Sequence, residues 1–138
     1  MGYLGDVIMM MQYEFENNIV NRRVSLPERL NKCSAYLYGY VPDGDFMRVD
    51  MPDKSILVKR MILLKSYSTP VMCFGRDANN DSFVILLPYC EGGTVSNTTA
   101  KHISKFCEKI GIPFMNIYFR KHPEKYFDKT GIRVYTWY

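Results

Sequence analysis

The sequence predicts an α+β fold in which one compact domain, residues 1–138, packs a mainly antiparallel sheet with a central hairpin against two or three helices. The chain is 47% hydrophobic and 23% charged, as in an ordinary globular domain, and its length allows one hydrophobic core. Short runs of β-branched and aromatic residues occupy its middle, with helical spacing before and after them. We therefore expect three parts: a helical part at about 1–40, a hairpin and helix at about 63–110, and a strand, helix and strand at about 112–138.

The N-terminal part begins with a run of good helix formers. Residues 7–20 follow Asp6, a suitable N-cap, and are predicted to be helical. The five consecutive apolar residues at 7–11 also fit a buried strand, so both structures stay open there. No basic residue precedes this run, so we expect no export signal. Asp6 replaces the Ser or Thr that N-myristoylation requires.

A second helix is predicted between Ser25 and Gly39. Ser25 and Glu28 have the spacing of a capping box, and Pro27 lies in the first turn, where its missing N–H costs nothing. Gly39 is suited to end the helix. The apolar stripe of this helix would consist of Leu26, Leu30, Cys33 and Leu37.

The middle of the chain is predicted to form strands. Residues 46–51 and 55–64 are two candidate strands separated by a Pro-Asp-Lys turn. Residues 66–74 and 82–90 flank the polar loop 75–81 and should form a hairpin. A helix should follow, with N-caps available among residues 96–99 and a stop at Gly111. Its buried face would be Ile103, Phe106, Cys107 and Ile110, and its outer face Lys101, Lys105 and Lys109.

The C-terminal part alternates between strand and helix patterns. Residues 114–119 are predicted to form a strand, and Pro123 should open a short helix that Gly131 ends. Residues 132–138 should form a last strand. One face of that strand would expose an unusual set of side chains, namely Arg133, Tyr135 and Trp137.

Positive charge is concentrated near the end of the chain. Residues 99–138 contain eight basic and three acidic side chains, whereas residues 1–98 contain ten and eleven. This asymmetry predicts a polyanionic or acidic partner, although lysines also serve simply to solvate a helix face. The predicted partner-binding basic face consists of Lys101, Lys105, Lys109, Arg120, Lys121, Lys125 and Lys129.

Two short motifs carry a resemblance. SYSTPVM at 66–72 and VSNTTAKHI at 95–103 resemble a small bacteriophage-type domain of unknown function, in which a SYxTxVA strand precedes a YSxTTxxHI helix start. The resemblance covers residues 63–107 only, and Met72 and Val95 depart from the pattern. The matching residues are Ser66, Tyr67, Thr69, Val71, Ser96, Thr98, Thr99, His102 and Ile103.

The motif residues also have a structural interpretation. Thr98 and Thr99 would satisfy N–H groups at the helix start, and Tyr67 would pack on the sheet. Ile103 would dock the helix on the hairpin. We expect His102 to be a structural histidine that donates to a strand carbonyl.

No catalytic or metal-binding pattern is present, and we expect neither an enzyme nor a cofactor. The two histidines are far apart, and no nucleophile elbow, phosphate loop or Cys-x-x-Cys pair occurs. Asp43, Asp45 and Asp50 lack the pattern of a calcium loop. The cysteines lack zinc-site spacing and are expected to be reduced and mostly buried; they are Cys33, Cys73, Cys90 and Cys107.

These observations favour a non-enzymatic binding protein. The resemblance implies a phage origin and no particular activity. With the plentiful Tyr and Met residues, 11 and 9, which suit protein interfaces, we expect an accessory protein in the cytoplasm of an infected bacterial host. It would bind and inhibit a nucleic-acid-processing or defence complex of the anti-CRISPR or anti-restriction type. The alternative is non-specific binding of DNA or RNA through the basic C-terminal surface, with tyrosines nearby for stacking. No apolar run approaches the roughly 20 residues that span a bilayer, so no membrane partner is expected.

Overall fold

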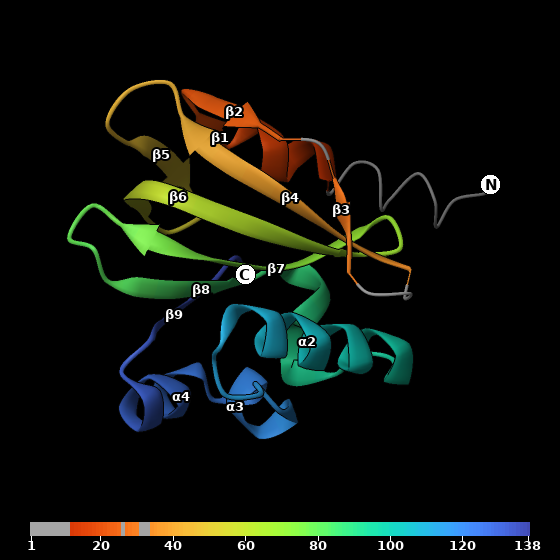
Figure 1. Cartoon of the computed structure of the whole chain (residues 1–138). Coiled ribbons are helices and arrows are strands. Elements are labelled where there is room, and N and C mark those ends of the chain that lie inside the picture. The colour runs from red at the N-terminus through yellow and green to blue at the C-terminus, as the bar shows by residue number, and fades with distance from the viewer. Residues whose placement is uncertain (1–11, 26, 31–33) are drawn as a thin grey trace.

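The computed structural model describes residues 12–25, 27–30 and 34–138. Over these residues nine strands form one sheet, and every strand pair is antiparallel except the last. Helices α2 (Asn97–Ile110), α3 (Ile117–Lys121) and α4 (Pro123–Thr130) lie together on one side of the sheet (Figure 1). The predicted α+β fold with its mainly antiparallel sheet is confirmed.

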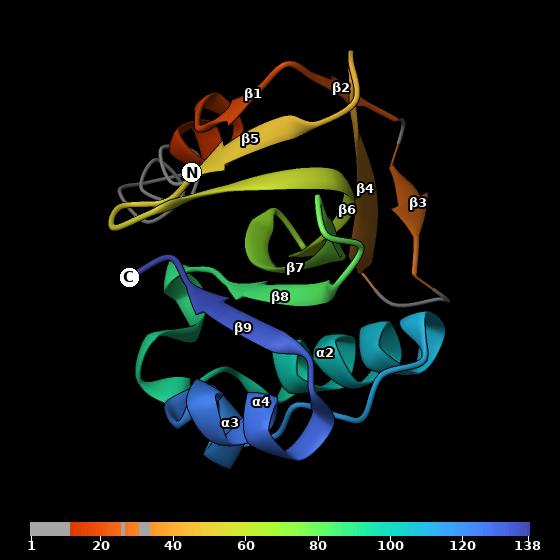
Figure 2. The same cartoon turned by 90° about the vertical axis from the view of Figure 1, so that its left-hand side faces the viewer.

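The sheet divides at its longest strand, β6. Residues 55–58 of β6 pair with β5, whereas residues 61–66 of the same edge pair with β4. The strands β5 and β4 therefore diverge, and the sheet curls (Figure 2). The strands are β1 (Ile19–Val20), β2 (Arg22–Val24), β3 (Glu28–Arg29), β4 (Ala35–Pro42), β5 (Met47–Asp50), β6 (Ser55–Ser66), β7 (Thr69–Asp77), β8 (Ser82–Leu86) and β9 (Arg133–Thr136).

Two hydrophobic clusters occupy the two faces of the sheet. The inner core lies within the curl and the outer core lies between the sheet and the helices. Phe15 and Trp137, from opposite ends of the described chain, meet in the inner core with ring centroids 5.4 Å apart. Buried members of the inner core include Phe15, Ile19, Tyr40, Val49, Met61, Leu63, Phe83 and Trp137. Buried members of the outer core include Leu37, Leu64, Val84, Leu86, Ile103, Phe106, Met115 and Tyr126.

Helix α2 has the predicted boundaries. The Ser96 side chain accepts a hydrogen bond from the Thr99 backbone N–H at 3.1 Å, so Ser96, and not the threonines Thr98 or Thr99, is the N-cap. Gly111 ends the helix at φ 75°, a left-handed conformation that glycine adopts without strain. The predicted buried face is confirmed, since Ile103, Phe106 and Cys107 are buried in the outer core.

The predicted strands of the central part are confirmed, except that the strand predicted at 82–90 ends at Leu86, and Pro88–Gly93 forms a 3₁₀ helix. Residues 46–51 contain β5, residues 55–64 lie within β6, and β7 pairs with β8 across a short polar loop. The strand predicted at 66–74 begins later, however. Ser66 ends β6, and Tyr67 has φ 56° in a tight turn that returns the chain to β7. Tyr67 is consequently exposed instead of packing on the sheet.

The helix predicted from Ser25 to Gly39 is wrong, because this region forms β3 and β4. Alternate residues of β4 enter the two cores: Leu37 lies in the outer core and Tyr40 in the inner core. Burial on both faces outweighs the local capping pattern. Gly39 lies inside β4, and its backbone N–H donates to Ser25 Oγ at 3.1 Å. A Cβ on Gly39 would approach that same oxygen to 2.5 Å, so a larger residue there would displace the Ser25 hydroxyl.

The other N-terminal predictions are settled in part. Of the helix predicted over 7–20, residues 12–17 are helical, but Ile19–Val20 form β1 instead. Asp6 and the ambiguous run 7–11 lie outside the described residues. Lys65 of β6 is buried beneath this short helix, with its Nζ 3.6 Å from a carboxylate oxygen of Glu16. Of the predicted stripe, Leu30 and Leu37 are buried, while residues 26 and 33 lie outside the described residues.

The strand predicted at 114–119 is also wrong. The Asn116 side chain accepts from the Phe119 backbone N–H at 3.2 Å and caps α3. The following prediction is correct, since α4 starts at Pro123 and ends at Gly131. The last strand, β9, pairs in parallel with β8 and lies between both cores, so Trp137 is buried and not exposed. Among the described helices, none is long and apolar enough to cross a membrane.

Candidate partner-binding surface

The residues of the two sequence motifs meet where β6 turns into β7 and α2 begins. Ser66 Oγ lies 2.7 Å from His102 Nδ1 and 3.1 Å from Thr99 Oγ1. Ser96 Oγ donates to Thr99 Oγ1 at 3.1 Å, which continues the chain of hydroxyl groups. The strand partner of His102 is therefore a side-chain hydroxyl and not the predicted carbonyl. Thr69, also in the motif, pairs with Ser66 at the start of β7.

This cluster holds the helix on the hairpin and is closed to substrates. A serine 2.7 Å from a histidine has the distance of a nucleophile and its base. Ser66 and His102 are only 3% and 2% exposed, however, so no substrate reaches the hydroxyl. Burial lowers the pKa of His102 and favours the neutral imidazole, whose Nδ1 accepts from or donates to Ser66 Oγ according to the tautomer. The prediction of a structural histidine agrees with this geometry.

The three predicted lysines of α2 are exposed, but two of them have carboxylate partners. Lys109 Nζ lies 3.0 Å from Glu28 of β3, and Lys105 Nζ lies 3.8 Å from Glu108 of the same helix. Lys101 remains without an ion pair within the described part of the chain. The outer face of α2 is therefore less positive than its sequence suggests.

Arg120 does not belong to the predicted basic face, because its side chain is buried. It is 4% exposed, donates from Nη1 to the Met115 carbonyl at 2.7 Å, and donates from Nε to the Gly93 carbonyl at 3.4 Å. Burial lowers the pKa of this guanidinium. Arg120 joins α3 to the 3₁₀ segment at Pro88–Gly93 and has a structural role.

The remaining predicted lysines lie on α3 and α4 and are exposed. No ion pair connects Lys121, Lys125 or Lys129 to a carboxylate within the described residues. Lys129 Nζ lies 5.6 Å from the centre of the Phe119 ring, a cation–π distance. These three lysines and Lys101 are the members of the predicted basic face that are exposed and have no ion pair within the described residues.

An aromatic groove of about 400 Å³ lies beside Lys129, which is one of its lining residues. Phe119 and Tyr126 pack edge to face within it, with ring centroids 5.3 Å apart. The Tyr126 hydroxyl donates to the Pro113 carbonyl at 2.9 Å and fixes the segment before α3. The groove is lined by Pro113, Phe114, Asn116, Phe119, Tyr126, Lys129, Thr130 and Ile132.

Three large apolar side chains near the groove are exposed within five residues of sequence. Phe114, Ile117 and Tyr118 are 45%, 49% and 52% exposed. The start of α3 at Asn116 places them outward, while Met115 alone of this run is buried. We call the following set the aromatic–lysine surface: Phe114, Ile117, Tyr118, Lys121, Lys125, Lys129 and the aromatic groove.

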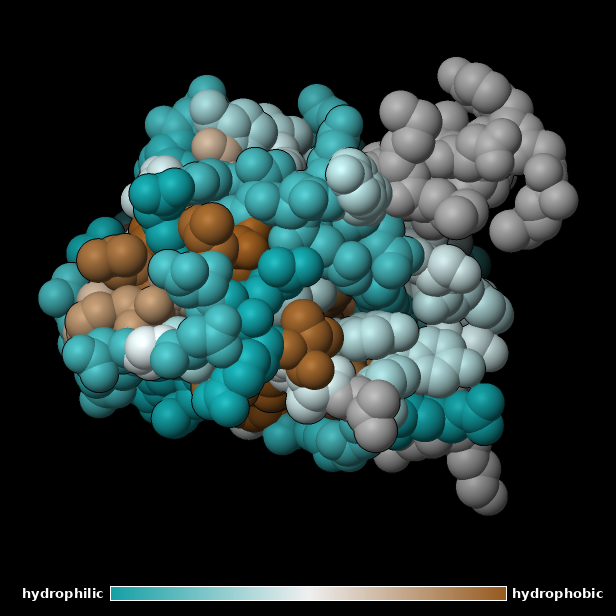
Figure 3. Space-filling model, turned by 90° about the horizontal axis from the view of Figure 1, so that it is seen from above, coloured by the Kyte–Doolittle hydropathy of each residue, from teal (hydrophilic) through white to brown (hydrophobic). Residues whose placement is uncertain are grey.

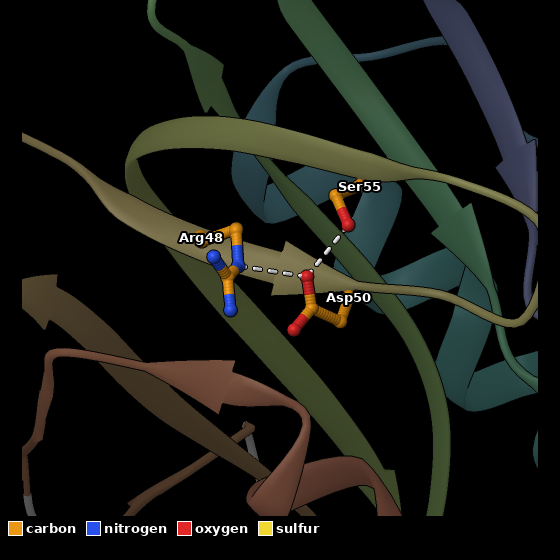
Figure 4. Close-up of polar contacts among 3 residues, drawn as sticks. All are labelled: Arg48, Asp50 and Ser55. Carbon is orange, nitrogen blue, oxygen red and sulfur yellow. Dashed lines mark hydrogen bonds and ion pairs between the residues drawn. The ribbon is translucent and has the colours of Figure 1, made fainter.

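The opposite side of the molecule has a different character. Seen from the side away from the helices, the surface is mostly hydrophilic, with separate hydrophobic patches (Figure 3). Polar groups there bind one another: Asp50 Oδ1 accepts from Ser55 Oγ at 2.6 Å and pairs with Arg48 Nε at 2.9 Å (Figure 4). The Ser55 hydrogen bond is the main cause that lowers the pKa of Asp50.

Metal binding finds no support in the described residues. They contain no group of three or more His, Cys, Asp or Glu side chains placed to hold an ion. Cys73, Cys90 and Cys107 are free and buried, as predicted, and Cys33 lies outside the described residues. Burial raises the pKa of the Cys90 thiol to about 12, so this sulfur is protonated and unreactive at neutral pH.

Comparison of the chain with protein-family models, curated proteins and solved structures finds no match. Sequence reasoning identified the lysines of this surface but missed the groove, because it assigned residues 114–119 to a strand. The sequence signal for α3 was Asn116, a residue type that commonly caps a helix start and here accepts from the backbone N–H three residues later.

Proposed function

We propose that this protein is a non-enzymatic binding protein whose aromatic–lysine surface occupies an acidic segment of a partner protein. The observation that supports this proposal is the exposure of Phe114, which lines a groove of about 400 Å³, and of Ile117 and Tyr118, which follow it in sequence. Clustered apolar side chains with a polar rim are a common property of interaction sites on soluble proteins.

The chemistry of the surface defines the segment that would fit. An apolar side chain entering the groove would remove the exposed parts of Phe114 and Phe119 from water, which supplies affinity. Lys121, Lys125 and Lys129 favour carboxylates at the rim and would accelerate the encounter at low salt. The segment should therefore combine an apolar or aromatic anchor with neighbouring Asp or Glu residues.

The resemblance to a phage-type domain suggests where such a partner belongs. We propose a host nucleic-acid-processing or defence complex, which the protein inhibits by covering a surface and without chemistry. Direct binding of nucleic acid is the second candidate, because Phe114 and Tyr118 are exposed next to lysines and bases stack on such rings.

Capture from a nuclease-treated bacterial lysate tests the proposal when it is run with matched variants. The site variants are Ile117→Ser with Tyr118→Ser, and Lys125→Glu with Lys129→Glu. The control is Val24→Ser with Leu57→Ser, which removes apolar side chains of similar exposure, 46% and 50%, from the strands. Circular dichroism confirms that all variants fold.

We expect a protein that the wild type and the control capture equally and that both site variants lose. Equal capture by the site variants, or no capture at all, contradicts the proposal. A partner that disappears with nuclease treatment contradicts it as well, and assigns the surface to nucleic acid. Binding of an oligonucleotide with a steep salt dependence would confirm that second assignment.

A further inference from the structure

Two arginines face each other on the outer side of the sheet. Arg60 of β6 and Arg76 of β7 are direct cross-strand partners. Like charges in this position destabilise a strand pair. Within the described residues, no carboxylate lies within 4.0 Å of either guanidinium. The arrangement works against stability, which points to a use outside the fold.

A β-bulge places Arg60 on this face. The register shifts between Val58, which pairs with Asp77, and Arg60, which pairs with Arg76, so Lys59 is the extra residue. Side chains alternate along a regular strand, and Arg60 would then follow Val58 into the inner core. The bulge turns Arg60 to the outer side instead, which is a known use of bulges beside functional sites.

Arg76 is fixed in position by the hairpin that follows it. Its Nη1 donates to the Asn80 carbonyl at 3.1 Å, which leaves its other N–H groups for a ligand. The loop itself is held by Asp77, whose Oδ1 accepts from the backbone N–H groups of Asn79 and Asp81, both at 2.9 Å. This guanidinium is preorganised before any ligand binds.

The two strands also approach each other closely at this point. Gly75 lies next to Arg76, and a Cβ there would collide with the backbone oxygen of Arg60. The absent side chain therefore allows the Arg60 backbone to lie against β7. Any other residue at position 75 would move the two arginines apart.

The pair stands at the rim of a groove of about 330 Å³ with an apolar floor. Ile62 and Phe74, also cross-strand partners, are half-buried beside the arginines. Ile110, the last residue of α2, forms the wall, and Gly39 of β4 lines the groove without a side chain. The groove thus combines two positive charges with a flat apolar surface.

We propose that this groove binds a nucleoside 5′-monophosphate, free or at the end of a nucleic-acid strand. Two guanidinium groups match the charge of a phosphate monoester, close to −2, better than that of a carboxylate or a phosphodiester. The base would lie on Phe74 and Ile62. The groove volume is within the range of small-ligand sites.

Isothermal titration calorimetry with AMP tests this proposal. The site variants are Arg60→Ala and Arg76→Ala, and the control is Arg29→Ala, an exposed arginine that lies over the Tyr36 ring on β4. Adenosine and inorganic phosphate serve as partial ligands. The melting temperature of each variant is measured alongside the titrations. Removing one of two like charges that face each other across the strands should not lower it.

We expect AMP to bind the wild type and the control, with affinity reduced about tenfold or more in each site variant. A 5′-phosphorylated oligonucleotide that binds as AMP does identifies a strand end as the ligand, and AMP binding alone identifies a free nucleotide. Absence of AMP binding overturns the proposal. Equal affinity in the site variants, or equal affinity for inorganic phosphate, overturns it too. None of these outcomes depends on the aromatic–lysine surface.

Discussion

Helix α2 and the segment from Gly111 to Lys121 follow one another in sequence and are both basic, yet they differ in what they offer a partner. On α2, Lys105 and Lys109 are paired with Glu108 and Glu28. The following segment buries its arginine, Arg120, and exposes its apolar side chains. The helical structure of α2 is predicted correctly from sequence, whereas the structure of the segment from Gly111 to Lys121 is not.

The difference shows that charge counted along a sequence does not give charge available at a surface. Glu28, which neutralises Lys109, is 81 residues away and lies in a strand that sequence reasoning assigned to a helix. Conversely, the exposed rings of Phe114 and Tyr118 belong to residues 114–119, which were predicted from the sequence to form a strand. Partner-binding capacity depends on long-range pairing that local patterns do not contain.

The largest expected effect is the difference in unfolding free energy between removing a buried ring of α2 and removing an exposed ring before α3. Phe106→Ala should lower the free energy of unfolding by about 3–5 kcal/mol, because Phe106 is fully buried in the outer core. Phe114→Ala should change it by less than about 1 kcal/mol while weakening partner capture. Urea unfolding of both variants measures this. Equal destabilisation would place Phe114 in the core and remove it from the aromatic–lysine surface.

The next effect distinguishes two neighbouring cations of α3. Arg120→Ala should cost about 1–3 kcal/mol, because it leaves the carbonyls of Met115 and Gly93 without their donor. Lys121→Ala should stay within about 0.5 kcal/mol of the wild type, since its side chain is exposed. Chemical denaturation gives both values. If Arg120→Ala were as stable as the wild type, water or another donor would have to replace the guanidinium.

The histidine of α2 gives a smaller, pH-dependent effect. Burial lowers the pKa of His102 below its ordinary value of 6.5, so the unfolded chain binds the proton more readily. The contribution of this group to stability is therefore complete above about pH 6.5 and decreases as the pH falls toward the folded pKa. Unfolding measured at about pH 7.5 and about pH 5.5 should show this decrease in the wild type.

His102→Gln should remove that part of the pH dependence and cost about 1 kcal/mol at neutral pH, through an imperfect bond to Ser66. His122→Gln is the control, because the His122 side chain is 51% exposed. An unchanged slope in His102→Gln would show that other groups cause the decrease.

The smallest effect tests whether Lys109 is truly paired. A double-mutant cycle of Lys109→Ala and Glu28→Ala should give a coupling of about 0.2–1 kcal/mol at low salt, because both side chains are partly exposed. High salt should abolish it. If the coupling energy at low salt is zero, Lys109 is not paired with Glu28 and is available to a partner, so α2 becomes a candidate partner surface again.

The parts of the fold that sequence predicted are those where several local patterns agree. For α2, the Ser96 cap, the Gly111 stop and the apolar spacing all indicate the same helix. For β4 they conflict: Ser25 and Glu28 have capping spacing, but pairing with β6 decides the structure. A cap counts for about 1 kcal/mol, less than burial of both faces of an eight-residue strand.

The candidate sites required information that no local pattern holds. The lysines at 121, 125 and 129 follow from counting charge, but the groove beside them depends on the helix that Asn116 caps. The arginine pair depends on a register, and the register depends on the bulge at Lys59. A one-residue shift in strand pairing changes which face a side chain occupies, so neither arginine could be placed from sequence.

The parallel strand β9 constrains how the protein is made. It brings Trp137 against Phe15 in the inner core, and Val134 of the same strand packs on the outer core. Neither core can close until residue 137 has emerged from the ribosome, although most of the sheet has been synthesised long before. The nascent chain must therefore hold its hairpins with apolar faces uncovered during translation, when chaperones have access to them.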